Sequence, residues 1–319
     1  MQMDGEESSN IEDRRDEGGG FAGGGFGGGL GGGGFGGGMG GPGLPIPVGG
    51  GLFKGGFGLI AIVVICLILG INPISLLTGL NGGTGYVAPP PPQTRTASRP
   101  SSGDDPEVQF VARVLKSTED VWNEQFQAMG RQYREPRLVL YRDVTRTACG
   151  MGQSAMGPFY CPPDQRVYLD LGFFDELARR FNAPGYFPQA YVVAHEIGHH
   201  VQNLLGITGK VDELRQRMSR RDGNAMSVRV ELQADCLAGV WANHANQERG
   251  GKMIDDKDVD QALAAATAIG DDRLQRQAQG KVVPDSFTHG TSAQRVRWFK
   301  RGLDTGDINR CDTFRAQQL

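Results

Sequence analysis

The alternation of apolar and polar residues divides the chain near residue 104. From there to the C-terminus, apolar residues recur at the three- and four-residue spacing of amphipathic helices. The first helix is expected to begin at 105–107 (DPE), which has the residue types of a cap and a first helical turn. Strands are expected at 137–141 (RLVLY) and 166–171 (RVYLDL). Because strands come early and helices follow, the pattern predicts an α+β domain over 104–319, mostly helical with a small sheet.

A second apolar region lies closer to the N-terminus. Residues 55–71 carry no charge, and the apolar character continues to Leu80. About 20 apolar residues cross the core of a bilayer, so one transmembrane helix is expected within 53–80. A buried core helix, or a signal peptide displaced by a long leader, is the alternative interpretation. The chain is then expected to be a single-pass protein of the cytoplasmic membrane, with its N-terminus inside and its large domain outside.

The segments on either side of this apolar region have the composition of non-globular chain. Residues 1–17 are charged and polar, and 25 of the 50 glycines fall between positions 18 and 58. Such sequence buries too little apolar surface to offset its ordering entropy, so 1–52 is expected to be disordered. Residues 81–103 contain four consecutive prolines with scattered serine, threonine and glycine, which predicts a semi-rigid linker.

Overall composition adds little beyond one exclusion. The 319 residues are 39% hydrophobic and 22% charged, with a net charge of −3. The C-terminal part alone is long enough to bury a core. A near-neutral balance without a basic face argues against nucleic acid as a partner.

The cysteines indicate a compartment. Cys66 lies in the apolar region, and the other four lie downstream of it. Cys149 and Cys161 bracket a loop rich in glycine and proline, which suits a local disulfide, and this leaves Cys236 and Cys311 as a second pair. An even number without a CxxC motif is typical of an oxidising environment. Four buried thiols in a cytosolic protein remain the alternative.

Candidate chemistry begins with the string AHEIGHH in a helix expected at 188–205. His195 and His199 are four residues apart, so both imidazoles lie on one helical face and can bind one metal ion. Glu196 lies beside them without having to be a ligand. A catalytic zinc site takes three protein ligands and leaves a fourth position for water.

A third ligand is available in a helix expected at 224–246. Glu231 and Asp235 are again four residues apart, in a helix that is otherwise largely apolar. Buried carboxylates usually have a charged or metal partner. We therefore expect Glu231 to complete a zinc site with His195 and His199. Asp235 is expected to accept the remaining N–H of a ligand imidazole.

These motifs carry a resemblance. HExxH followed by ExxxD resembles the gluzincin class of metallopeptidases. The tethered layout resembles a bacterial family described as putative neutral zinc metallopeptidases, over about residues 104–315 plus the apolar region. The strings that carry this resemblance are ACGMGQSAMGPFYCP, VYLDLGFFDEL, VVAHEIGHHVQ, ELQADCLAGVWA and THGTSAQRVRWF.

The resemblance implies a zincin-like fold and a peptidase with a peptide or protein substrate. Glu196 would act as general base for a metal-activated water. His289 would donate to the oxyanion, with Arg297 as the weaker candidate, and strand 166–171 would be the edge that pairs with substrate. His200 is expected to be a packed neighbour.

Two other functions fit the same residues. One is a non-catalytic, zinc-stabilised binding or scaffold protein at the cell envelope, although a purely structural site has no use for Glu196. The other is a zinc amidase of cell-wall peptides. His244 is expected to be solvated, and the sequence defines neither the specificity nor the oligomeric state.

Overall fold

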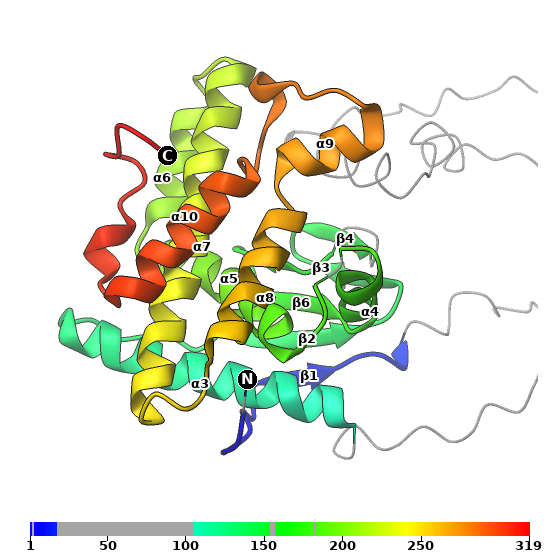
Figure 1. Ribbon diagram of the computed structural model, residues 1–319, viewed down its shortest axis with the longest axis vertical. Coiled ribbons are helices and arrows are strands. Elements are labelled where there is room, and N and C mark those ends of the chain that lie inside the picture. Colours follow the sequence, from blue (N-terminus) through cyan, green and yellow to red (C-terminus); the bar gives the residue numbers. More distant parts are fainter. Residues whose placement is uncertain (2, 18–104, 154–156, 182) are drawn as a thin grey trace, which may run out of the picture.

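The computed structural model describes residues 1, 3–17, 105–153, 157–181 and 183–319 (Figure 1). This part of the chain is mostly helical with a small sheet, as predicted for an α+β domain. The α-helices described are α3 (Pro106–Ala128), α4 (Gly172–Arg179), α5 (Tyr186–Leu204), α6 (Ile207–Arg215), α7 (Arg220–Glu248), α8 (Asp256–Ala268), α9 (Asp271–Gln279) and α10 (Ser292–Thr305). Two 3-10 turns, η4 (Pro284–Ser286) and η5 (Ile308–Cys311), complete the helical elements of this part.

The predicted start of α3 and the two predicted strands are confirmed, although the strand predicted at 166–171 ends at Asp170. Asp105 caps α3 by accepting a hydrogen bond from the backbone of Glu107, with Pro106 at the first helical position. The strands of the described residues are β1 (Ile11–Asp13), β2 (Arg137–Tyr141), β3 (Val144–Thr147), β4 (Gly150–Gln153), β5 (Phe159–Cys161) and β6 (Arg166–Asp170). β3 and β4 form a hairpin, and the other four form a sheet in the order β1-β2-β6-β5.

The four-stranded sheet has two differently covered faces. β1, β2 and β6 are parallel, with Arg137 opposite Arg166, while β5 runs antiparallel to β6. One face contributes buried residues to the main core shared with α3, α5 and α7, namely Leu138, Leu140, Val167 and Leu169. The opposite face forms a smaller cluster around Tyr168 and Cys161. Figure 1 shows the sheet on one side of the molecule and α7 and α10 on the other.

The expectation that 166–171 is an edge strand is wrong. β6 is paired on both sides, with β2 and with β5. Between β5 and β6 the chain makes a tight turn that includes Gln165, with a φ of 55°. This turn pairs β5 with the side of β6 that β2 leaves open. Period-two alternation shows that a strand is present but does not indicate how many partners it has. β1 and β5 are the two edges of this sheet.

The expected disorder of residues 1–17 is also wrong for the described residues among them. β1 pairs with β2 over three residues, from Ile11 opposite Leu138 to Asp13 opposite Leu140. Met3 and Ser8 are both only 7% exposed. A composition rich in charge predicted disorder because three residues of strand give almost no periodic signal.

Helices α5, α7 and α10 pack with their backbones unusually close. A Cβ atom on Gly302 of α10 would lie 1.9 Å from the carbonyl oxygen of Cys236 in α7, and one on Gly198 of α5 would lie 2.9 Å from that of Ala234. Only glycine permits these approaches. They bring α7 alongside α5 at the level of the HEIGHH string, and α10 against the other side of α7.

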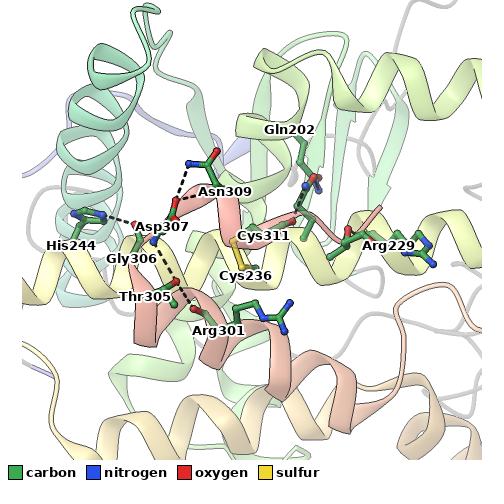
Figure 2. The surroundings of a disulfide bond; sticks show 12 residues. Gln202, Arg229, Cys236, His244, Arg301, Thr305, Gly306, Asp307, Asn309 and Cys311 are labelled. Atoms are coloured by element: carbon green, nitrogen blue, oxygen red, sulfur yellow. Dashed lines mark hydrogen bonds between the residues drawn. A yellow bond between two sulfur atoms is a disulfide. The ribbon is translucent and has the colours of Figure 1, made fainter. Parts of the chain in front are cut away.

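Two disulfides join parts of this fold. Cys149–Cys161 links the start of β4 to β5, and Cys236–Cys311 links α7 to η5 (Figure 2).

No helix in the described residues is both long and apolar enough to cross a membrane. The expected span at 53–80, the linker at 81–103 and the glycine-rich part of 1–52 lie outside the described residues.

Candidate metal centre

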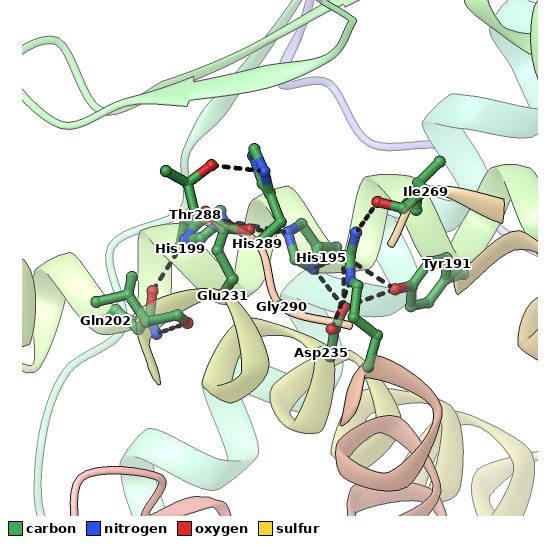
Figure 3. A network of polar contacts seen from close by, with 12 residues as sticks. Tyr191, His195, His199, Gln202, Glu231, Asp235, Ile269, Thr288, His289 and Gly290 are labelled. Carbon is green, nitrogen blue, oxygen red and sulfur yellow. Dashed lines mark hydrogen bonds and ion pairs between the residues drawn. The ribbon is translucent and has the colours of Figure 1, made fainter. Parts of the chain in front are cut away.

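Three side chains from two helices meet beside the sheet (Figure 3). His195 and His199 lie one turn apart on α5, and Glu231 faces them from α7. One ligand atom from each lies within 4.8 Å of the others. The His195 Nε2 is 3.2 Å from the His199 Nε2 and 3.2 Å from a Glu231 oxygen, and the His199 Nε2 is 3.6 Å from the same oxygen. The trio expected from the sequence is therefore assembled.

These separations fit zinc. Ligand atoms at about 2.0–2.1 Å from zinc in a tetrahedral site lie about 3.3 Å from one another. The three observed distances bracket that value. Two imidazole nitrogens and one carboxylate oxygen are also the donor types that zinc takes in catalytic sites.

The surrounding hydrogen bonds fix how each imidazole is oriented. The Gln202 amide nitrogen donates to the Val230 carbonyl, so its oxygen accepts from the Nδ1–H of His199 at 2.9 Å. The His195 Nδ1–H donates to Asp235 at 2.8 Å. Each ring therefore presents the lone pair of Nε2 to the point that Glu231 also faces. Three electron-rich atoms aimed at one point call for a cation between them.

Asp235 is held by groups that the sequence pattern does not indicate. Arg295 of α10 binds both its carboxylate oxygens at 2.8 Å, and the Tyr191 hydroxyl donates to one of them at 2.6 Å. Burial would raise the pKa of Asp235, but Arg295 outweighs it and lowers the pKa to about 2. Asp235 is thus a permanent anion behind His195. Arg295 was missed because it lies sixty residues from its partner, with no local spacing to relate them.

The acids raise the pKa of both histidines. Burial alone would lower the pKa of His195, but Asp235 and Glu231 raise it to about 10. The pKa of His199 is also raised, because Glu231 outweighs burial. Both imidazoles therefore hold a proton more tightly than a free imidazole does. A metal ion bound by their Nε2 atoms would compete with that proton, so metal affinity is expected to rise with pH.

Glu196 differs from Glu231 in the contacts that its carboxylate makes. It is only 8% exposed and lies on α5 next to a ligand. Its charge contributes to the raised pKa of His199, so it is close to the trio. Within the described part of the chain, its carboxylate makes no hydrogen bond or ion pair. Among the described residues, Glu196 is thus a carboxylate that lies close to the trio and that no hydrogen bond or ion pair holds in place.

His289 reaches the same site from the loop before α10 (Figure 3). The Asp271 carboxylate at the start of α9 accepts backbone N–H groups from Thr288, His289 and Gly290 at 2.6–3.0 Å, which fixes the loop. The His289 Nδ1 lies 3.3 Å from the same carboxylate. Burial would lower the pKa of His289, but Glu231 and Asp271 raise it to about 8. The His289 side chain is 38% exposed, so it is open to solvent beside the trio.

Comparison with known proteins identifies the family. The model of the family described as "Putative neutral zinc metallopeptidase" matches residues 1–314. This chain belongs to that family. It is 47% identical over 308 residues to "Uncharacterized protein YpfJ" of Escherichia coli, covering 97% of this chain and 96% of that one. It is also 47% identical over 195 residues to "Uncharacterized protein Rv2575" of Mycobacterium tuberculosis, covering 59% of this chain and 65% of that one. No solved structure matches.

The other residues that the sequence singled out do not join the trio. His200 is fully buried and bonds the Tyr160 hydroxyl and the Arg134 carbonyl, as expected of a packed neighbour. His244 is not simply solvated, because its Nε2 lies 2.8 Å from the Gly306 carbonyl. The expectation that Arg297 could donate to the oxyanion is wrong, because Arg297 is exposed and donates to the Leu319 carbonyl. On an amphipathic helix, a residue two positions from a buried one faces away from it.

Proposed function

We propose that this protein is a zinc-dependent peptidase in which His195, His199 and Glu231 hold the metal and Glu196 is the general base. The observation that carries the proposal is the difference between the two glutamates. Glu231 forms ion pairs with both histidines, whereas Glu196 lies beside them without a hydrogen bond or ion pair to any described residue. A site that only stabilises the fold closes with four protein ligands and has no need of such a carboxylate.

The side chains divide the work of hydrolysis between them. A zinc ion in this site supplies the Lewis acidity that brings the pKa of water towards neutrality. Glu196 accepts the proton of the attacking water and passes it to the leaving amine. His289, which Asp271 holds beside the site, donates a hydrogen bond to the oxyanion that develops on the substrate carbonyl. Asp235 keeps His195 in the tautomer whose Nε2 binds metal.

The wider setting of the proposal follows from the sequence and the disulfides. We take the fold to be zincin-like, since the helix with the HExxH motif packs against a small sheet with an antiparallel edge strand. The substrate is a peptide or protein. Two disulfides favour an oxidising compartment outside the cytoplasm, where segment 53–80 would hold the domain at the membrane.

The test is a pair of conservative variants of the full-length protein, with denatured casein as substrate. Glu196→Gln should retain zinc and lose turnover by about 100-fold or more, because it removes the base alone. Glu231→Gln should lose the zinc itself. If zinc-loaded Glu196→Gln cleaves as fast as the native protein, the proposed mechanism is wrong. If the zinc-loaded native protein cleaves neither casein nor a peptide library, the scaffold interpretation replaces it.

A further inference from the structure

The N-terminal segment, residues 3–17, is built into the domain that carries the metal centre. β1 completes the sheet beside β2. The backbone N–H of Arg14 donates to the Leu140 carbonyl at 2.7 Å, and that of Ser8 donates to the Ala112 carbonyl of α3 at 3.0 Å. These contacts extend the segment along both the sheet and the helix beneath it, as Figure 1 shows.

A buried carboxylate in α3 depends on this segment. Glu119 is 4% exposed, and its Oε1 accepts hydrogen bonds from the Ser8 hydroxyl at 2.6 Å and the Asn10 amide at 2.9 Å. Both of these donors lie in the N-terminal segment. A buried acid without hydrogen-bond partners is strongly unfavourable. Residues 8–10 therefore supply the hydrogen bonds that Glu119 makes in its buried position.

The segment also brings the two ends of the connecting chain together. Arg15 forms ion pairs with Asp13 and with Asp105, at 2.8 Å and 2.6 Å. Asp105 is the cap of α3, the first helix after the apolar region. Arg15 and Asp105, which lie on either side of the stretch 18–104 that contains the apolar region, are thus in direct contact.

From these contacts we infer that residues 1–17 and the domain 105–319 lie on the same side of the membrane. A segment that crossed the bilayer once would put β1 and β2 on opposite sides, which their pairing forbids. This replaces the orientation expected from the sequence, in which the N-terminus is inside and the domain outside. If β1 of one copy paired instead with β2 of a second copy in the same orientation, β1 and β2 would still have to lie on one side of the membrane, so the conclusion would be the same.

The inference does not rest on peptidase activity and can be tested in cells. Single cysteines are introduced at two exposed positions, Ser9→Cys and Gln216→Cys, each in the full-length chain carrying Cys66→Ala. The four remaining cysteines are disulfide-bonded. Intact spheroplasts are treated with a membrane-impermeant maleimide, before and after detergent. Both cysteines should react under the same condition. If one reacts in intact spheroplasts and the other only after detergent, the inference is wrong.

A second measurement tests the docking itself on the purified full-length protein. Ser8→Ala should raise the equilibrium constant for unfolding by about tenfold or more, because it removes a bond to a buried carboxylate. In a Glu119→Leu background, the same substitution should have almost no effect. An equal effect in both backgrounds would show that Ser8 does not dock on α3 and would overturn the argument.

Discussion

Arg295 offers the sharpest test of how the metal centre is supported. It is 3% exposed, and it is the described group that satisfies Oδ2 of Asp235, while Tyr191 and His195 bond Oδ1. Arg295→Met keeps much of the side-chain volume but leaves a buried anion without its counter-charge. Breaking such a pair costs about 3–5 kcal/mol, and we expect the lower end because Oδ1 keeps two donors. Zinc affinity should also fall by about 10- to 100-fold, since His195 loses its fixed anion.

The assay is chemical unfolding of the full-length protein followed by tryptophan fluorescence. All three tryptophans are buried and report on the core. The matched control is Arg297→Met, because Arg297 lies on the same helix but is exposed, and the change should stay within about 0.5 kcal/mol. Adding Asp235→Asn to Arg295→Met should restore part of the stability by removing the unpaired charge. If Arg295→Met is as stable as the control and binds zinc equally well, the reasoning is refuted.

Three further predictions concern stability and assembly of the site. Burial lowers the pKa of His200 to about 4, so the unfolded state takes up its proton first as pH falls. The free energy of unfolding should therefore fall by about 3 kcal/mol between about pH 6.5 and 4. His200→Phe should abolish this part of the decrease, as measured by unfolding curves recorded across that pH range. The methyl group of Gly198→Ala would collide with the backbone of α7, so this variant should move Glu231 away from the histidines and reduce the zinc content of the folded protein. Gly209→Ala is the control, because its methyl group would have no neighbour within 4 Å, and it should not change the zinc content. Replacing Cys236 and Cys311 by alanine opens a link across 75 residues and should lower the unfolding free energy by about 4 kcal/mol.

The candidate metal ligands could be predicted because local spacing determines them. Residues four apart share a helical face, so the pairing of His195 with His199, and of Glu231 with Asp235, follows from the amino-acid sequence alone. The α3 cap at Asp105 and the strands at 137–141 and 166–170 are equally local features.

The rest of the site and fold depends on long-range pairing. Arg295 binds Asp235 from another helix, and the partner of Glu119 comes from the other end of the chain. β1 and β5 are three residues each, which is too short for alternation to be visible. The same shortness explains why β6 was expected at an edge and the N-terminal segment was expected to be disordered.

The most direct measurement is the zinc content of the purified full-length protein by elemental mass spectrometry. The control is the double variant His195→Ala, His199→Ala, with its fold verified by circular dichroism. We expect about one zinc per native chain and none in the control. A folded native protein that stays metal-free in excess zinc at pH 8, or a control that binds as much, would contradict it.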